Sequence, residues 1–294
     1  MTILVTASTG NVGREVVHAL QAKGIAFRAA DSRPERVVAL LGDDVPAVRL
    51  DFRETSTFLP AIEGCTAVFL LRPPAIANVK ETLLPFIDAA RAQGARQIVF
   101  LSVAGAGKNK LVPHHAVEAH LARRSDDWTI LRPGFFAQNL GDAYRLDIVD
   151  DDLLYAPAGR GRFAFVDVRD VAEVAAAALA DPSAHVKKAY TLTGPAAVTF
   201  DDAAALLSEA LGRPIRYEPA SVVGYARHLR SRGMPATQIM VQTILHLGLR
   251  FGQGAHVDPT LASLLGRPGR TLREYIRDHV DVWKHRDGAK ARAG

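Results

Sequence analysis

The first half of the chain alternates short apolar runs with stretches in which apolar residues recur every three or four positions. Continuous apolar runs are typical of strands buried on both faces, and the longer repeat predicts helices with one buried face. The expected strands are 3–6, 26–31, 47–50, 67–71, 97–102 and 129–132, and the expected helices between them include 34–41, 56–62, 79–91 and 116–123. This alternation predicts a doubly wound parallel α/β sheet.

The pattern changes after about residue 135, where helical periodicity dominates. Strands are expected at 162–166 and 189–193, with an alanine-rich helix at 168–180 between them. Helices are then expected at 200–211, 222–232, 237–247, 260–265 and 272–283. We therefore expect one domain formed by 1–134 with 162–193. A smaller, mainly helical lobe, 135–161 with 194–294, is expected to cap the substrate.

A glycine turn joins the first strand to the first helix. Ala7, Gly10 and Gly13 form an A-x-x-G-x-x-G pattern, and the second strand ends on Asp31. Glycines at such a turn let the backbone approach a pyrophosphate, and the helix N-terminus offers it N–H groups and a positive dipole end. Thr9, Gly10, Asn11 and Val12 are therefore predicted to hold the pyrophosphate. Alanine fits the first position only if its φ is negative.

The acid at the end of the second strand bears on the choice between NAD and NADP. Asp31 can accept hydrogen bonds from the adenosine ribose hydroxyls and repels a 2′-phosphate, so the sequence favours NAD. Arg33 and Arg28 lie close enough in sequence to reach a 2′-phosphate instead. Ser32 has a second interpretation, because Ser32 with Glu35 resembles a helix capping box.

The composition excludes several classes of site and partner but does not indicate a function. Apolar and charged residues make up 48% and 23% of the chain, which is ordinary for a globular protein, and the net charge is +5. The single cysteine, Cys65, excludes an internal disulfide and is compatible with a cytoplasmic location. The lysines and arginines are scattered apart from a terminal cluster at 284–292, so no nucleic-acid partner is expected. The sequence shows no metal-ligand spacing and no apolar run long enough to span a bilayer.

Several longer segments carry a family resemblance. They are 5–13, 51–52, 98–102, 129–139, 165–172 and 190–195. In these segments the chain resembles the NmrA-like group of atypical short-chain dehydrogenases. The resemblance implies a Rossmann domain that binds NAD or NADP beneath a helical lobe. The group contains quinone and enone reductases as well as regulators that sense the cofactor without catalysis.

The resemblance also assigns roles to three short segments. Asp51 and Phe52 match the pair that brackets the adenine, although Asp51 would equally cap a strand end. Leu71, Arg72 and Pro73 follow the fourth strand at the edge where such sheets bind ligands, with Arg72 facing either a ligand or water. The run 133–135, Pro-Gly-Phe, is expected near the nicotinamide, with Phe135 in the core as the alternative.

The expected catalytic residues are Ser102, His114 and His115. Ser102 ends the fifth strand and is also assigned to the cofactor site, but the tyrosine and lysine that follow it in conventional short-chain dehydrogenases are missing. Either histidine falls where relatives place a lysine or histidine facing the nicotinamide, or both lie in solvent. The expected function is hydride transfer from NAD(P)H to a small conjugated or aromatic acceptor (a quinone, enone or ketone). The alternative is a non-catalytic, cofactor-sensing regulatory protein. Either function is compatible with an oligomer.

Overall fold

The computed structural model describes residues 1–123 and 127–284, so 285–292 of the basic terminal cluster lie outside the described residues. The chain folds into two compact units. The first contains Met1–Pro133, Val168–Leu192 and Thr260–Arg267, and the second contains Gly134–Asp167, Thr193–Pro259 and Pro268–Gly294.

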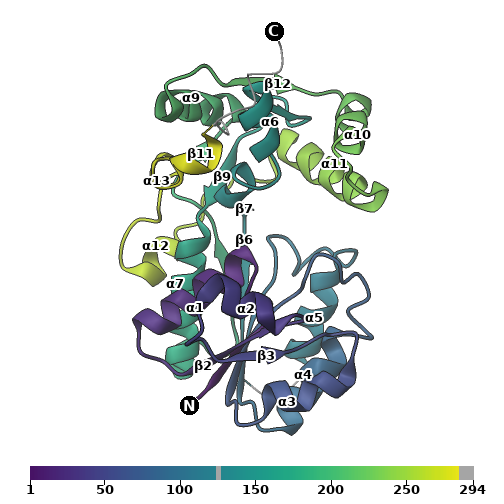
Figure 1. Cartoon of the computed structure of the whole chain (residues 1–294), viewed down its shortest axis with the longest axis vertical. Coiled ribbons are helices and arrows are strands. Elements are labelled where there is room, and N and C mark those ends of the chain that lie inside the picture. The colour runs from purple at the N-terminus through teal and green to yellow at the C-terminus, as the bar shows by residue number, and fades with distance from the viewer. Residues whose placement is uncertain (124–126, 285–294) are drawn as a thin grey trace. The chain divides into compact units, whose positions relative to one another are not determined.

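A seven-stranded parallel sheet forms the first unit (Figure 1). Its strand order is β10-β6-β5-β4-β1-β2-β3. The strands are β1 Ile3–Val5, β2 Phe27–Asp31, β3 Ala47–Arg49, β4 Ala67–Leu71, β5 Gln97–Leu101, β6 Asp127–Pro133 and β10 Lys188–Leu192. Because β1 lies between β2 and β4, the strand order reverses at β1, and ligands bind such sheets outside the carboxyl ends of the strands at this point. The predicted doubly wound parallel fold is confirmed.

Helices cover both faces of this sheet. Alternate strand residues such as Leu4, Val68 and Phe100 share a buried cluster with α3, α4 and α5. On the other face, α1 packs against α7, and α12 packs against α7. The bounds are α1 Asn11–Ala22, α2 Pro34–Leu41, η1 Thr55–Thr57, α3 Phe58–Ile62, α4 Leu83–Ala92, α5 Pro113–Ala122, α7 Val168–Ala180, α8 Pro182–His185 and α12 Thr260–Leu265.

The second unit is mainly helical, as predicted, and surrounds an aromatic core. Phe163 and Phe200 are fully buried there, with ring centroids 4.8 Å apart. Its strands are β7 Phe135–Phe136, β8 Leu153–Ala156, β9 Phe163–Val166, β11 Ala197–Val198 and β12 Arg216–Pro219. Its helices are η2 Ala137–Leu140, α6 Arg145–Asp151, α9 Phe200–Leu211, α10 Val222–Ser231, α11 Ala236–Arg250, α13 Leu272–Asp278 and η3 Val280–Trp283.

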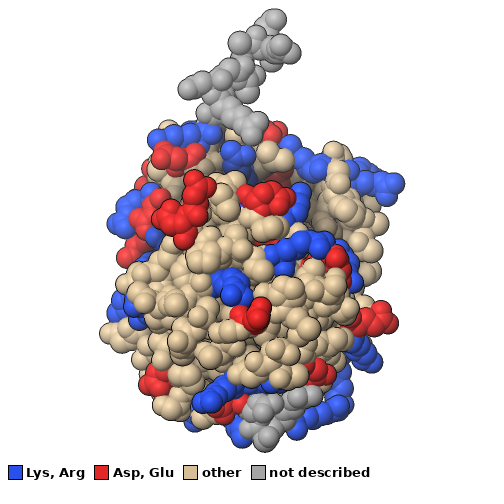
Figure 2. All heavy atoms as spheres, turned by 60° about the horizontal axis from the view of Figure 1, so that its bottom comes forward, with Lys and Arg blue, Asp and Glu red and all other residues tan. Residues whose placement is uncertain are grey.

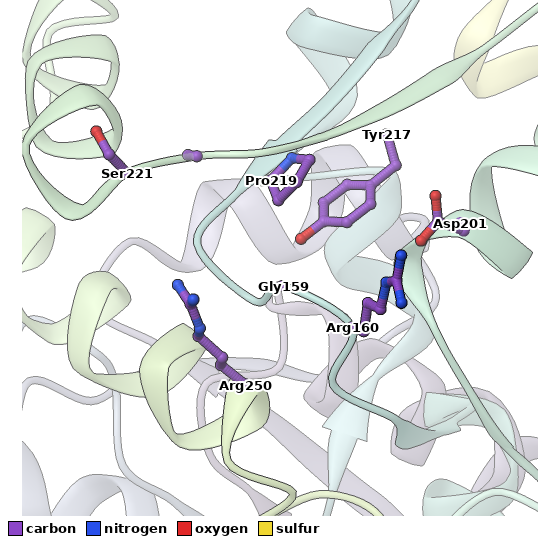
Figure 3. A pocket seen from close by; sticks show the side chains of 8 residues that line it. Gly159, Arg160, Asp201, Tyr217, Pro219, Ser221 and Arg250 are labelled. Carbon is purple, nitrogen blue, oxygen red and sulfur yellow. The ribbon is translucent and has the colours of Figure 1, made fainter.

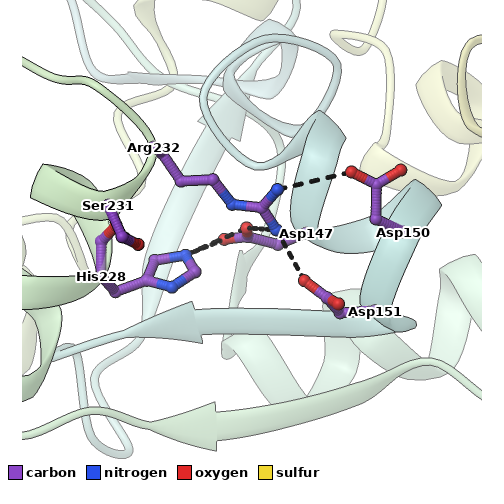
Figure 4. Close-up of polar contacts among 6 residues, drawn as sticks. All are labelled: Asp147, Asp150, Asp151, His228, Ser231 and Arg232. Atoms are coloured by element: carbon purple, nitrogen blue, oxygen red, sulfur yellow. Dashed lines mark hydrogen bonds and ion pairs between the residues drawn. The ribbon is translucent and has the colours of Figure 1, made fainter.

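A buried carboxylate ties α10 to α6 within this unit (Figure 4). Asp147 is 5% exposed and contacts both His228 Nε2, at 2.9 Å, and Arg232 Nη2, at 3.0 Å. The same guanidinium also reaches Asp150 and Asp151. Ser231 donates its hydroxyl to the His228 carbonyl rather than to the ring. The ion pairs of Asp147 with His228 and Arg232 therefore connect the two helices.

Two segments, and the single residues Gly134 and Thr193, fall in a different unit from the one the sequence suggested. Residues 162–167 belong to the second unit because β9 pairs with β7 and β11 instead of joining the large sheet. Residues 260–267 belong to the first unit because α12 packs on α7 and β10.

The surface carries charge of both signs. In Figure 2, lysine and arginine side chains are interspersed with aspartate and glutamate on the face drawn. Within residues 1–123 and 127–284, no helix combines the length and apolarity that a bilayer crossing requires.

Candidate cofactor site

The glycine turn lies at the carboxyl end of β1, and its first residue corrects a sequence expectation. Ala7 has a φ of +50°, not the negative value expected. Hydrogen bonds fix the chain on both sides of it, because Thr6 N–H bonds to Phe69 O in β4 and Ser8 N–H bonds to Ala30 O in β2. Together they place Ala7 in the left-handed region, where an alanine costs roughly 1–2 kcal/mol.

Gly13 is needed for packing between the turn and the helix. A Cβ built on Gly13 would lie 2.2 Å from the Ala7 carbonyl oxygen and 2.8 Å from the Ser8 Cα. Both are backbone atoms, so the contact cannot be relieved by a side-chain rotation. The third glycine of the pattern therefore keeps α1 in direct contact with the turn, as the pattern predicts.

Gly10, in contrast, is not required by the chain itself. Its φ is −81°, and among the described residues a Cβ there would meet only the Ala7 carbonyl oxygen, at 3.4 Å, an ordinary contact distance. Gly10 is exposed and is the N-cap of α1, and the first turn carries no acidic side chain. An open backbone approach to a positive helix end fits a phosphate group, so the residues present suit the pyrophosphate of a dinucleotide.

Replacing Gly10 with alanine is expected to separate ligand binding from folding. The unliganded variant should lose only the fraction of a kcal/mol typical of exchanging glycine for alanine at an N-cap. Its affinity for NADH or NADPH should fall about tenfold or more, because the methyl group occupies the approach of the phosphate. At a ligand concentration about one hundred times the wild-type Kd, the ligand-induced stabilisation should then fall by about 1.4 kcal/mol in a thermal melt. An unchanged ligand-induced shift would contradict the assignment of Gly10.

Asp31 lies beside the turn, as predicted. Its side chain is 9% exposed and accepts hydrogen bonds from the Thr9 hydroxyl and, at 3.0 Å, from the Arg33 N–H. Ser32 Oγ lies 3.4 Å from the same carboxylate. The structure therefore brings Thr9, Gly10, Asn11, Val12 and Asp31 together at one edge of the sheet.

The structure does not show the alternative roles that the sequence left open for Ser32 and Arg28 near Asp31. The capping box is wrong, because the N-cap of α2 is Arg33 rather than Ser32, and Ser32 turns to Asp31. The guanidinium of Arg28 donates to the Pro60, Ala61 and Glu63 carbonyls at the end of α3, so it is engaged away from Asp31.

Asp51 and Phe52 both make contacts that stabilise the fold. Asp51 Oδ1 accepts the Arg53 N–H at 2.9 Å, which is the strand-end turn proposed as the alternative. Phe52 is 4% exposed and packs edge-on against Phe86, with centroids 5.1 Å apart. No contact seen here assigns either residue to an adenine, so that role stays a prediction.

Arg72 follows Leu71 at the end of β4 and folds back onto its own loop. Its Nη1 donates to the carbonyls of Pro73, Pro74 and Ile76, and its Nε donates to His114 Nε2 at 3.3 Å. Burial lowers the pKa of this guanidinium. Arg72 therefore shapes the loop after β4 rather than facing water.

His114 is a neutral, buried residue in the first turn of α5. It is 8% exposed, and burial, with the Arg72 charge adding to it, lowers its pKa to about 3. Because Nε2 accepts from Arg72, the ring proton lies on Nδ1, which has no partner among the described residues. The burial of His114 therefore favours the neutral imidazole, and the catalytic role expected for it stays a prediction.

His115 contacts the loop after β5. Its Nδ1 lies 2.8 Å from the Ala106 carbonyl oxygen, so Nδ1 carries the proton and Nε2 is left as the second polar atom of a half-buried ring.

The sequence missed a buried polar network around Ser102. Ser102 is 1% exposed and donates its hydroxyl to Glu118 Oε1 at 2.5 Å. Glu118 is 5% exposed and forms a bidentate pair with Arg132, with N–O distances of 3.0 and 2.6 Å. The signal available in the sequence was Arg132, a cation near the end of an otherwise apolar strand. In this arrangement the Ser102 hydroxyl proton already has an acceptor, and the catalytic role expected for Ser102 stays a prediction.

The segment expected near the nicotinamide divides between the two units. Pro133 ends β6 and accepts a hydrogen bond from Ala104 N–H, whereas Gly134 and Phe135 belong to the second unit. Phe135 packs against Phe163 and Phe165, with centroids 5.2 and 5.5 Å away, as the core alternative had it. No group of histidine, cysteine and carboxylate side chains among the described residues could hold a metal ion.

Comparison with known proteins identifies the type of site. A family model described as NAD(P)H-binding matches residues 7–182. The NAD(P)H azoreductase of Xenophilus azovorans is 31% identical over 287 residues, covering 95% of this chain and 98% of the relative. The (4-alkanoyl-5-oxo-2,5-dihydrofuran-3-yl)methyl phosphate reductase of Streptomyces griseus is 32% identical over 287 residues, covering 96% and 99%.

A solved structure that is similar to this chain is also that of a reductase. The NADPH-dependent quinone oxidoreductase of Escherichia coli, in complex with NADPH, is 25% identical with a TM-score of 0.83, covering 96% of this chain and 100% of that one. The resemblance inferred from the sequence motifs, to NmrA-like atypical short-chain dehydrogenases, is thus confirmed. The chain belongs to the NAD(P)H-binding family.

Proposed function

We propose that this protein is an NAD(P)H-dependent oxidoreductase that reduces a small conjugated or aromatic acceptor. The observation that carries the proposal is the open backbone at Gly10 beside Asp31, at the point where the strand order reverses. Thr9, Gly10, Asn11 and Val12 would hold the pyrophosphate, and Asp31 would accept from the adenosine ribose. When bound, the reduced nicotinamide supplies a hydride to the acceptor.

The groups around Ser102 favour an acceptor that needs no strong acid. Ser102 donates to Glu118, His114 is neutral, and the tyrosine and lysine of conventional relatives are missing. An isolated ketone reduced by hydride forms a basic alkoxide that calls for a positioned proton donor, whereas a conjugated acceptor spreads the charge. Of the residues predicted as catalytic, His115 or a water it orients is the one we propose for protonation.

The relatives support the same class of acceptor. Their names specify an azo compound, a dihydrofuranone phosphate and a quinone, and each of these groups contains a conjugated electrophilic double bond. We therefore propose quinones, azo compounds and conjugated enones as acceptors. The cytoplasmic location and an oligomeric state stay predictions.

One observation favours the sensing alternative. In the structure, neither the Ser102 hydroxyl nor a protonated His114 is available to a reacting group. A protein with this arrangement could bind the cofactor and change a partner-binding surface without turnover.

Oxidation of NADH and NADPH, measured with a panel of quinones, azo dyes and enones, tests the proposal. Turnover with at least one conjugated acceptor and little with simple ketones is expected. Tight binding of the reduced cofactor with no turnover across the panel would instead favour the sensor.

Asp31 is expected to set the cofactor preference toward NADH. Exchanging it for asparagine removes the negative charge that repels a 2′-phosphate and leaves an amide of similar size. The ratio of kcat/KM for NADPH to that for NADH should rise about tenfold or more, equivalent to about 1.4 kcal/mol. Exchanging the neighbouring exposed Arg33 for glutamine is the control, and it should move the ratio in the opposite direction or leave it unchanged. A ratio that Asp31→Asn does not alter would remove Asp31 from the ribose site.

A further inference from the structure

The residues proposed for cofactor binding and for proton transfer all belong to the first unit. The open pocket of about 980 Å³ drawn in Figure 3 is lined, in contrast, only by residues of the second unit, among them Tyr217 and Arg250. The contacts that orient His115 are made within the first unit, by the loop of residues 102–112 that joins β5 to α5.

This loop is fixed at its start and again at its middle. Ser102 N–H bonds to the Leu131 carbonyl of β6 at 2.8 Å. Further along, the fully buried Ala106 has its carbonyl oxygen 2.8 Å from Nδ1 of His115. Because a carbonyl oxygen can only accept, the position of Ala106 decides which ring nitrogen of the neutral His115 carries the proton.

Arg132, near the end of β6, lies against the next residue of the loop. A Cβ built on Gly107 would lie 2.6 Å from Arg132 Nη2 and 2.9 Å from its Cζ, so the guanidinium occupies the space that a side chain at this position would need. The guanidinium is not free to turn away. Its Nε and Nη2 donate to the two oxygens of Glu118, which is 5% exposed.

These contacts form a closed circuit that begins and ends on α5. Glu118 of α5 holds Arg132, and Arg132 lies against Gly107. The adjoining Ala106 carbonyl accepts from His115, three positions before Glu118 on the same helix. The buried ion pair therefore sets the distance between the loop and the helix. Among the described residues, Nε2 of His115 has no partner, so it is the nitrogen left for proton transfer.

We propose that Arg132 and Gly107 are positioning residues for proton transfer by His115. The guanidinium supports the loop, and the Ala106 carbonyl then keeps the proton of the neutral ring on Nδ1. Nε2 takes up a proton from solvent and donates it to the acceptor atom that becomes negatively charged when the hydride arrives. This inference rests on the proposed oxidoreductase function, and both positioning residues act through His115.

The first measurement needs no turnover. Nuclear magnetic resonance of ring-¹⁵N-labelled histidine reports which nitrogen carries the proton at a pH where the ring is neutral, and His115→Gln assigns the signal. The wild type should show the Nδ1–H form. Gly107→Ala and Arg132→Lys should each shift His115 to a mixture of both forms, because the Ala106 carbonyl leaves hydrogen-bond distance. Lysine keeps the charge opposite Glu118 but lacks the planar group that lies against Gly107.

The second measurement is kinetic. With 1,4-naphthoquinone as the acceptor, Gly107→Ala should lower kcat about tenfold or more, because the ring is displaced from the acceptor, and the KM for NADH should stay within about twofold. In a His115→Gln background the same exchange should have little further effect, since both changes act through one group. Lys108→Ala, which removes an exposed side chain of the same loop, should alter neither the tautomer nor kcat.

A His115 ring that keeps Nδ1–H in both variants would overturn the proposal. So would a loss of kcat as large in the His115→Gln background as in the wild type, or an effect of Lys108→Ala equal to that of Gly107→Ala, since a general disturbance of the loop produces both. If the wild type reduces no acceptor, the proposed function fails, while the tautomer measurement still decides whether Arg132 positions His115. Arg132→Lys supplies both measurements if Gly107→Ala does not fold.

Discussion

Gly13→Ala is expected to destabilise the protein by about 3 kcal/mol or more, the largest effect of any single methyl group in the cofactor site. The added Cβ would lie 2.2 Å from the Ala7 carbonyl oxygen, and Ala7 is itself fixed by the hydrogen bonds of Thr6 and Ser8 to two strands. Because backbone on both sides resists movement, either α1 shifts from the sheet or the turn opens. The Tm should fall by roughly 5 °C or more in a calorimetric scan.

Gly10→Ala is the matched control, since it adds the same methyl group three positions earlier. It should leave the unliganded Tm nearly unchanged and weaken cofactor binding, whereas Gly13→Ala should lower the Tm with or without ligand. A Gly13→Ala protein that melts within about a degree of the wild type would show that the turn and α1 are not in the close contact described.

Glu118→Gln is expected to cost about 3 kcal/mol, measured as a lower urea midpoint for unfolding with an unchanged m-value. The exchange keeps the side-chain volume but removes the buried charge of Glu118 and leaves the partly buried Arg132 guanidinium without its bidentate partner. It also replaces the charged acceptor of the Ser102 hydroxyl with a neutral amide.

Two further variants test whether this loss of stability comes from breaking a buried ion pair. The double exchange Glu118→Leu with Arg132→Met should recover much of the stability, because apolar residues of similar size often replace a buried ion pair at little cost. Glu54→Gln breaks the bidentate pair of Arg49 and Glu54 on the surface of the same unit, and it should have a small effect because solvent screens that pair. A loss for Glu54→Gln as large as that for Glu118→Gln would contradict the role assigned to burial.

Local patterns predicted the sheet well because a buried parallel strand leaves a clear apolar run. The strands from β1 to β6 all lie within a few residues of their predicted bounds. Helix starts were less certain. Helix α5 begins at Pro113, three residues before the predicted start, because proline suits the first helical position, and α4 begins at Leu83 rather than at 79. The sequence predicted residues 162–167 in the first unit, but they belong to the second. A short apolar run does not reveal which sheet it joins.

The candidate site was predictable where it depends on neighbours in sequence and unpredictable where it depends on distant partners. The glycine turn and Asp31 lie in one βαβ unit, so their proximity follows from the pattern. The left-handed φ of Ala7 depends on hydrogen bonds to β2 and β4, far away in sequence. The pairing of Ser102, Glu118 and Arg132 and the burial of His114 likewise arise only when β5, α5 and β6 have come together.

The discontinuous first unit has a consequence for how the protein is made. Its residues 1–133 leave the ribosome well before β10, which completes the sheet by pairing with β6, and before α12, which packs on α7. At translation rates of about 5–20 residues per second, the nascent chain presents the open edge of β6 for several seconds. An unpaired strand edge invites pairing with other chains. Chaperone supply and translation speed should therefore govern the yield of folded protein in heterologous expression more strongly than the stability of the finished molecule does.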